Sequence, residues 1–419
     1  MNAKDIIYLD ANATTPMAAE VQEVVKDAMA NAWGNVSSSN VLGHEAKRYV
    51  ERARKQTASM IQAKPGEIVF TSGGTESNCT ILHTFAKVHR MKGGGDISVP
   101  HIITSNIEHD SVQKPLEQMH RDGQAHVTFV QVDKTSHAVR VADVLEAIRP
   151  NTVLITIMLA NNETGVIQPI KDLSQAIQNY NQSSENRVYF HSDAAQAIGK
   201  IRVSVEDLGV DYLTIVGHKF YGPRIGALYV RNLEVGDCPL EPIFVGGGQE
   251  RHYRAGTENT AMIAGLGAAC ELVATNIQTY QLHMQTLRDQ LEEELSVALK
   301  SHGITFNGRN SLSERLPNTC NVSIVSGAFN GRTVLENCEM VVASVGAACH
   351  SKAGSKASAV LLASGIPYES ACNALRLSVG RETTSQQISA AVIDICNAVH
   401  SINQSLNVSA DFHTNDNHL

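Results

Sequence analysis

Short apolar segments alternate with stretches of helical periodicity along most of the chain, and this alternation restricts the fold more than any other feature. The apolar segments are rich in valine, isoleucine and leucine, which is typical of buried strands. Strands that alternate with helices predict an α/β fold with a mostly parallel sheet covered by helices on both faces, and such a sheet binds ligands at the carboxyl ends of its strands. The predicted strands cover residues 67–71, 101–105, 126–132, 152–159, 187–191, 211–216 and 225–230.

The chain of 419 residues is long enough for one large and one smaller domain. Residues 261–300 have helical periodicity, and further strands are predicted at 319–324 and 375–379. We take the long helix as the connection to a smaller C-terminal α/β domain. The expected division is 1–15 as an N-terminal segment of the small domain, 16–265 as the large domain, 266–408 as the small domain and 409–419 as a disordered tail.

Composition limits the classes of partner. The net charge is −8 and lysine and arginine are not clustered, which argues against nucleic acid and against an acidic membrane surface. No apolar run approaches the roughly 20 residues of a membrane span, and a strand-like segment begins at residue 6, so we expect neither a membrane span nor a signal peptide. The eight cysteines have neither CxxC nor zinc-like spacing, so we expect no metal site, reduced thiols and a cytosolic protein.

Lys219 ends an apolar strand and stands just before a glycine-containing turn. Charge is poorly solvated in such a setting, which lowers the pKa of a lysine and favours a neutral amine able to form a Schiff base. An ion pair is the alternative explanation for a lysine at this position.

Other polar residues follow predicted strands in the same way. Gly74 and Thr75 open a helix, where free N–H groups and the positive helix end favour a phosphate, although an ordinary capped turn fits equally well. Asp193 could keep a pyridine nitrogen protonated or could cap a helix, and His109 could stack on a ring or be an ordinary structural histidine. Together with Lys219, these residues predict a site for pyridoxal 5'-phosphate.

Two residues of the predicted small domain have groups that could react with or bind a substrate. Cys349 ends an apolar run and precedes a stretch rich in glycine, serine and lysine, a setting that favours a thiolate nucleophile, although a free cysteine is more often a small buried residue. Arg376 lies in a predicted strand and offers a bidentate fork to a substrate carboxylate, but an ion pair between the domains is equally compatible.

Taken together, these motifs resemble the cysteine desulfurase and selenocysteine lyase family of pyridoxal phosphate enzymes, which has the class V aminotransferase fold (fold type I). The resemblance covers nearly the whole chain. The segments that carry it are residues 9–16, 34–35, 71–78, 159–165, 193–196, 217–223, 246–259 and 374–381.

The resemblance implies a role for each residue. Lys219 holds the cofactor as a Schiff base and takes the substrate Cα proton, while Cys349 accepts the chalcogen atom. The cofactor ring contacts His109 and Asp193, its phenolic oxygen contacts Gln196 and Asn162, and its phosphate contacts Gly74, Thr75, His218 and Thr257 of a neighbouring subunit, which implies a homodimer. Arg376 binds the substrate carboxylate with help from Asn35.

Several segments are more similar to the selenocysteine lyase branch than to the iron–sulfur desulfurases. Val216 stands where those desulfurases commonly place a serine that binds the phosphate. The expected reaction therefore converts L-selenocysteine to L-alanine and selenide, with a selenium acceptor such as a selenophosphate synthetase. A cysteine desulfurase that delivers persulfide sulfur, a class V transaminase and a protein that binds the cofactor without activity are the alternatives.

Overall fold

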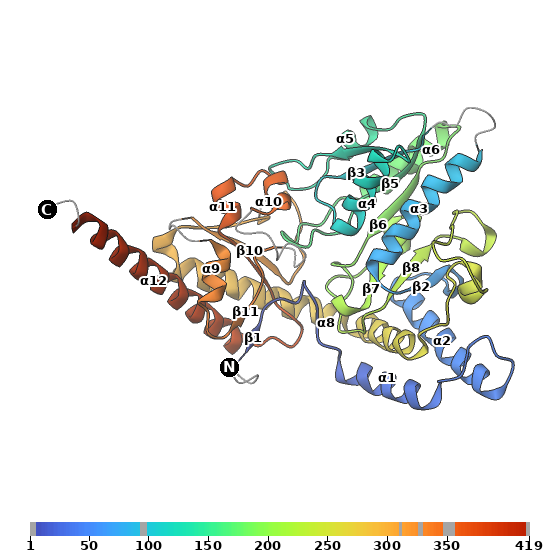
Figure 1. Ribbon diagram of the computed structural model, residues 1–419, viewed down its shortest axis with the longest axis horizontal. Coiled ribbons are helices and arrows are strands. Elements are labelled where there is room, and N and C mark those ends of the chain that lie inside the picture. Colours follow the sequence, from blue (N-terminus) through green and yellow to red (C-terminus); the bar gives the residue numbers. More distant parts are fainter. Residues whose placement is uncertain (1–5, 93–98, 310–311, 326–329, 347–356, 416–419) are drawn as a thin grey trace.

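The structure, a computed structural model, describes residues 6–92, 99–309, 312–325, 330–346 and 357–415. Two lobes are joined along one long helix, α8 (Thr260–Ala298) (Figure 1). The larger lobe holds a seven-stranded sheet, and the smaller lobe holds a three-stranded and a two-stranded sheet. The α/β fold class expected from the sequence is confirmed.

The large sheet has the strand order β2-β8-β7-β6-β5-β3-β4. Its neighbouring strands are parallel except at β8, which is antiparallel to both β7 and β2. Every residue of β7 is buried, which explains why the strand has no polar alternation in sequence. The strands are β2 (Ile68–Thr71), β3 (His101–Ser105), β4 (His126–Val130), β5 (Thr152–Thr156), β6 (Tyr189–Asp193), β7 (Tyr212–Val216) and β8 (Gly226–Val230), each within two residues of a predicted start.

Helices cover both faces of this sheet. Ile103 and Ile155 belong to one apolar cluster and Ile102 and Leu154 to another, because successive side chains of a strand point to opposite faces. Helices α1, α2, α6 and the first half of α8 pack in the first cluster, and α3 and α4 pack in the second. The helices of this lobe are α1 (Ala19–Asn31), α2 (Val41–Met60), α3 (Gly74–Lys92), α4 (Asp110–Arg121), α5 (Val141–Glu146), α6 (Ile170–Ser183) and α7 (Val205–Leu208).

The smaller lobe combines the C-terminal part of the chain with its N-terminal segment. The first strand, β1 (Ile7–Tyr8), pairs in parallel with β11 (Val341–Val342). The antiparallel strands β9 (Ile304–Phe306), β10 (Thr319–Ile324) and β12 (Ala374–Ser378) form the second sheet. The helices are α9 (Gly331–Glu336), α10 (Ala359–Ala363), α11 (Tyr368–Cys372) and α12 (Ser385–Asn415), and short 3-10 turns in the two lobes are Pro65–Glu67, Gly217–Lys219, Leu233–Val235, Gln249–His252 and Lys300–His302.

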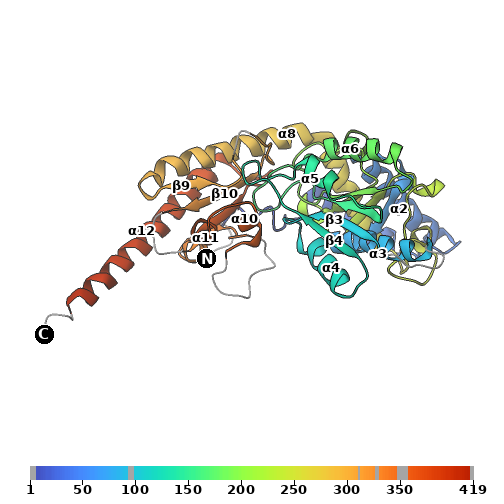
Figure 2. The same cartoon turned by 90° about the horizontal axis from the view of Figure 1, so that it is seen from above.

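Helix α8 runs along both lobes, as Figure 2 shows from above. Val273 still packs in the core of the large lobe, whereas Met284 packs in the core of the small lobe. The boundary expected after residue 265 therefore falls inside a helix that both cores share. By length and composition alone α8 could cross a membrane, and half of that apolar window is buried within the protein.

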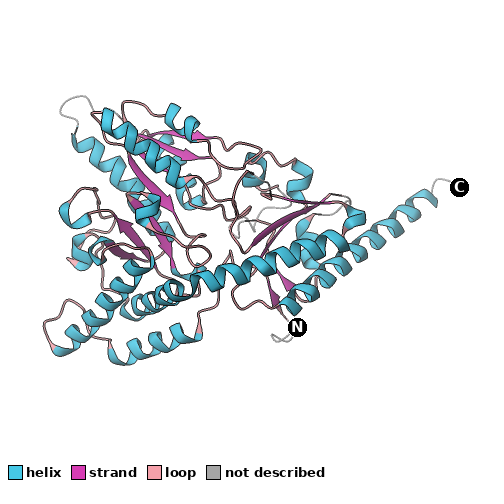
Figure 3. Ribbon diagram, turned by 180° about the vertical axis from the view of Figure 1, so that it is seen from behind, coloured by secondary structure: helices cyan, strands magenta, loops and turns pink. Residues whose placement is uncertain are grey.

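Helix α12 extends beyond the small lobe toward the C-terminus (Figure 3). Its backbone is helical to Asn415, so the helix includes residues 409–415 of the segment expected to be a disordered tail, and residues 416–419 lie outside the described residues. Once the packed part of a helix has formed, each further residue adds a hydrogen bond without a new nucleation cost, and polar composition does not prevent that extension.

Candidate active site

Most of the predicted cofactor residues lie at the carboxyl ends of strands of the large sheet. Gly74 opens α3 after β2, and His109 caps α4 after β3. Asn162 follows β5, Asp193 is the last residue of β6, and Lys219 ends the 3-10 turn after β7. Residues far apart in sequence therefore meet at one edge of the sheet, as parallel topology requires.

The Lys219 amine points toward the N-terminal segment, which crosses to the large sheet from β1 in the small lobe. Its Nζ donates hydrogen bonds to the backbone carbonyls of Asn12 at 2.7 Å and Ala13 at 2.8 Å. The residue is half-buried. Both lobes thus contribute to the surroundings of this amine.

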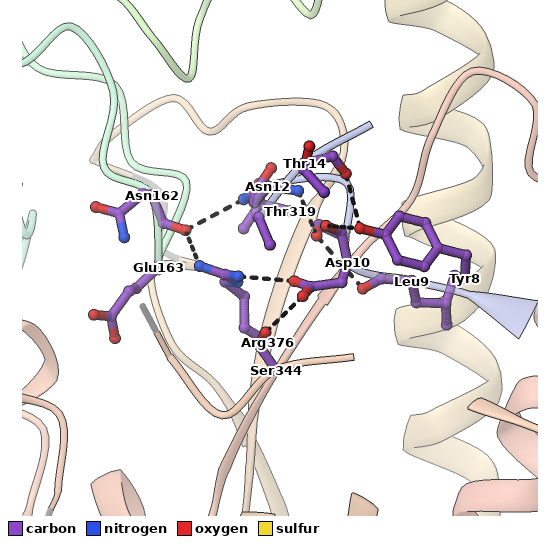
Figure 4. A network of polar contacts seen from close by, with 12 residues as sticks. Tyr8, Leu9, Asp10, Asn12, Thr14, Asn162, Glu163, Thr319, Ser344 and Arg376 are labelled. Atoms are coloured by element: carbon purple, nitrogen blue, oxygen red, sulfur yellow. Dashed lines mark hydrogen bonds and ion pairs between the residues drawn. The ribbon is translucent and has the colours of Figure 1, made fainter. Parts of the chain in front are cut away.

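Asn12 connects more of these residues than any other and had no role in the sequence prediction. Its carbonyl also accepts a hydrogen bond from Gln196 Nε2 at 3.0 Å. Its side-chain amide donates to the Asn162 carbonyl at 3.3 Å and to Thr319 at 2.9 Å (Figure 4). The only sequence signal for Asn12 was its place in the motif at residues 9–16.

Two donors hold the Asp193 carboxylate. Oδ2 accepts from Asn78 Nδ2 and Oδ1 accepts from the Ala195 N–H, at 2.8 and 2.9 Å respectively. Asn78 is itself fixed, since its Oδ1 accepts from Thr214 at 2.7 Å. The carboxylate is buried and oriented before any ligand binds.

His109 is joined to Asp193 through side chains that the sequence did not single out. His109 Nδ1 accepts from the Ser111 N–H at 3.1 Å and lies 2.8 Å from Ser111 Oγ. Ser111 Oγ in turn accepts from Asn78 Nδ2 at 2.8 Å. Because a backbone N–H can only donate, Nδ1 is the acceptor, and a neutral His109 ring carries its proton on Nε2.

Gly74 stands where α3 begins and where only a glycine fits. A Cβ atom on Gly74 would lie 2.6 Å from Val216 Cγ2, closer than a real Cβ contact allows. The first-turn N–H groups of the 19-residue helix are therefore approachable at a point without a side chain. Thr75 is exposed beside them.

His218, the residue before Lys219, is an uncharged imidazole at neutral pH. Burial lowers its pKa to about 4, and the positive charges of Lys219 and Arg224 add to that effect. Nδ1 lies 3.0 Å from Thr14 Oγ1. His218 therefore enters the site as a neutral hydrogen-bonding group.

Arg376 lies on β12, fully buried between the lobes, with 1% of its surface exposed. Its Nη2 is 2.8 Å from Asp10 Oδ1, and its Nη1 donates to the Asn162 carbonyl at 3.2 Å (Figure 4). Ser344 Oγ donates to the other Asp10 oxygen at 2.7 Å. Nε has no hydrogen-bond partner among the described residues. The ion pair considered from the sequence is present, and one nitrogen of the fork remains available.

Two further ionisable groups at this edge were not expected from the sequence. Glu108 is fully buried, accepts hydrogen bonds from Ser105 Oγ at 2.5 Å and from the Met158 N–H at 3.0 Å, and has its pKa raised to about 8 by that burial. Lys200 is also buried and donates to Gln196. Their only sequence signal is their position next to residues of the predicted site.

Asn35 and Thr257 lie on exposed loops, with no hydrogen bond from either to this cluster among the described residues. Asn35 is exposed in the loop between α1 and α2, where its side chain accepts from the Ser37 N–H. Thr257 is exposed in the loop before α8. Cys349 lies outside the described residues.

The arrangement can hold an anionic, aromatic cofactor with a reactive carbonyl. The N-terminus of α3 can bind a phosphate, Asp193 can pair with a protonated ring nitrogen, and Lys219 can attack a carbonyl carbon. The residue set thus fits pyridoxal phosphate in charge and in chemistry.

Comparison with known proteins agrees with this chemistry. The class-V aminotransferase model matches residues 7–390. The chain is 52% identical to selenocysteine lyase of Rattus norvegicus over 94% of its length and 95% of that protein. It is 40% identical to cysteine desulfurase IscS of Methanosarcina thermophila, over 91% and 89% of the two chains.

A solved NifS-like protein has a TM-score of 0.81 and 31% identity, and the match covers 94% of this chain and 99% of that one. Proteins of these kinds depend in general on pyridoxal phosphate. Both the fold and the relatives therefore lead to one conclusion, which is that the chain belongs to the class-V aminotransferase family.

Proposed function

We propose that this protein is a pyridoxal phosphate-dependent selenocysteine lyase, which cleaves the Cβ–Se bond of L-selenocysteine and forms L-alanine. The observation that carries the proposal is the position of the Lys219 amine and the fixed Asp193 carboxylate at the carboxyl ends of two paired strands, β7 and β6. The choice of selenium rests on identity, which is 52% to a selenocysteine lyase and 40% to a cysteine desulfurase.

The cofactor would be held by residues from five strand ends. Gly74, Thr75 and His218 would bind its phosphate, Asp193 its ring nitrogen, His109 its ring face, and Gln196 with Asn162 its phenolic oxygen. When bound, pyridoxal phosphate supplies an electron sink for the electron pair that remains on Cα after its proton leaves.

Lys219 would attach the cofactor and, once its amine is released, take the proton from substrate Cα. The carbonyls of Asn12 and Ala13 keep this amine at the site by hydrogen bonding. Arg376 would bind the substrate carboxylate, which has to share the guanidinium with Asp10 or displace it.

Selenium would pass to the thiolate of Cys349. In that transfer the Cβ–Se bond breaks and a sulfur–selenium bond forms, while Cβ keeps the electron pair and takes a proton to become the methyl group of alanine. Release of selenide then requires two electrons from a second thiol. An acceptor protein such as a selenophosphate synthetase would use the released selenium.

The direct experiment incubates the purified protein with L-selenocysteine or L-cysteine in the presence of dithiothreitol and measures alanine, selenide and sulfide. We expect alanine and selenide from selenocysteine with little sulfide from cysteine. Comparable sulfide would favour a cysteine desulfurase, and alanine from neither substrate would overturn both functions.

Two variants assign the roles of the lysine and the thiol. Borohydride reduction of the wild type should attach the cofactor permanently to Lys219, so that digestion yields a peptide that carries it. K219A should yield no labelled peptide. C349A should keep the cofactor and lose protein-bound selenium, whereas unchanged bound selenium would remove Cys349 from the transfer.

The proposal includes a homodimer and a cytosolic location. Exposed apolar side chains gather around the connection between α1 and α2, with Met29 at 64%, Trp33 at 67% and Val41 at 79% exposure. A second subunit that covers them would explain their exposure in one chain. The seven cysteines of the described residues are free thiols, which supports a reducing compartment.

A further inference from the structure

A second lysine, Lys200, lies close to Lys219 and has no part in the steps above. It is 3% exposed and follows β6 by a short segment. Its Nζ donates to the backbone carbonyl of Gln196 at 2.9 Å and to Gln196 Oε1 at 3.0 Å. Both hydrogen bonds are to Gln196, which is a residue of the predicted cofactor site.

The contacts of Gln196 fix which way its amide points. Gln196 Nε2 lies 3.0 Å from the Asn12 carbonyl, which can only accept a hydrogen bond. The same carbonyl accepts from Lys219 Nζ at 2.7 Å. The Asn12 carbonyl thus binds the NH₂ group of Gln196 and Lys200 binds its side-chain oxygen, so the NH₂ group lies on the side of Lys219.

Lys200 acts here as a hydrogen-bond donor more than as a charge. No ion pair of the described residues includes it. Burial lowers its pKa well below the ordinary value, and the charges of Lys219 and Arg376 lower it further. His218, which Lys200 also faces, has its pKa lowered by burial as well. The two hydrogen bonds to Gln196 need two N–H groups, and the amine supplies them in either protonation state.

We propose that Lys200 is a positioning residue, which holds the Gln196 amide so that its NH₂ group donates to the phenolic oxygen of the bound cofactor. This inference rests on the function proposed above. If Lys200 were absent, the amide could rotate and turn its oxygen toward the phenolic oxygen. Both of these oxygens are acceptors, so no hydrogen bond would form between them. A donor at that position stabilises the deprotonated phenolic oxygen and lowers the pH at which the cofactor changes its absorbance.

The test measures the visible absorbance of the bound cofactor against pH. K200M keeps an unbranched side chain, one atom shorter, and removes its donors. We expect its titration midpoint to rise by about one pH unit, the size of one lost hydrogen bond to a charged group. K171M, a change at an exposed lysine in α6, should keep the wild-type midpoint.

A double-mutant cycle separates positioning from a direct effect of charge. Q196A should raise the midpoint as K200M does, and K200M should add nothing further in the Q196A background. An equal shift in both backgrounds would overturn the inference, because Lys200 would then act without Gln196. K200Q retains a donor and should restore part of the wild-type midpoint, and it provides the measurement if K200M does not fold.

The outcomes also separate this inference from the proposed function. If the wild type binds cofactor and K200M titrates at the wild-type midpoint, Lys200 has no positioning role and the lyase proposal stands. If wild-type protein binds no pyridoxal phosphate, both proposals are overturned.

Discussion

Asp193 and Glu108 are two buried carboxyl groups at the same edge of the sheet, with different surroundings. Asp193 accepts from the Asn78 amide and the Ala195 N–H, which suits an ionised carboxylate. Burial raises the pKa of Glu108 to about 8, so its carboxyl is mostly protonated at neutral pH. Asp193 can therefore pair with a cation, whereas Glu108 is a buried neutral group beside the site.

The stability of the protein should depend on pH through Glu108. Its folded-state pKa lies above the ordinary value, so its contribution to stability is complete below the unfolded-state pKa and is lost as pH rises toward about 8. E108Q has no such proton to lose. We expect the free energy of unfolding of E108Q to rise relative to that of the wild type between about pH 5 and pH 8, by at most about 1.4 kcal/mol per pH unit. Thermal unfolding over this pH range measures the difference.

E117Q, on α4, is the matched control. Partial burial acts to raise the pKa of Glu117, but hydrogen bonds from Gln113 and Lys114 outweigh it and lower that pKa. Glu117 is therefore ionised in both states above about pH 6, and the difference between E117Q and the wild type should stay constant. A constant difference for E108Q as well would show that Glu108 does not change its pKa on folding.

At the scale of elements, local sequence predicted the strands and the residues at their ends. Asp193 ends β6, and Lys219 and His109 come within four residues of the ends of β7 and β3, so their place at the carboxyl edge follows from parallel topology. Asn12 could not be found in this way, because it reaches the site only after β1 pairs with β11 more than 300 residues later. The pattern of residues within a short stretch of sequence does not predict a pairing over that distance.

The start of α3 should not tolerate a side chain at Gly74. G74A would bring a Cβ to 2.6 Å from Val216 Cγ2, and a β-branched valine has little freedom to move. We expect a loss of about 1–3 kcal/mol of stability and weaker retention of cofactor, measured by thermal unfolding and absorbance. G73A should be tolerated in the cofactor-free protein, since nothing lies within 4 Å of a Cβ there.

A second substitution tests the cause of that loss. V216A removes the methyl group in question, so the double variant with G74A should recover part of the lost stability. If G74A and G73A have equal effects, the close approach to Val216 is not the reason for a glycine at this position.

At the scale of the whole molecule, a second subunit should bury the exposed apolar residues near the α1–α2 connection. W33E places a charge on the most exposed aromatic side chain of that surface. We expect sedimentation to show a dimer for the wild type and a monomer for W33E, with loss of cofactor if Thr257 binds the phosphate of its neighbour. V297E, at an exposed valine of α8, should remain dimeric, and a dimeric W33E would place the interface elsewhere.

The two lobes are tied together at Arg376, whose partners come from the N-terminal segment and from the loop after β5. D10N removes the negative charge and leaves a buried guanidinium without a counter-ion, which should cost about 3–5 kcal/mol. D289N is the comparison: it removes a carboxylate that pairs with the buried Arg288 but is itself 53% exposed, so it should cost less than D10N.

Ligand binding should reverse part of the loss in D10N. If Arg376 binds the substrate carboxylate, the carboxylate of L-alanine supplies the missing charge, and alanine should raise the melting temperature of D10N more than that of the wild type or D289N. Thermal unfolding with and without alanine measures this difference. An equal rise in all three proteins would leave Arg376 as a structural tie between the lobes and would assign the substrate carboxylate to another residue.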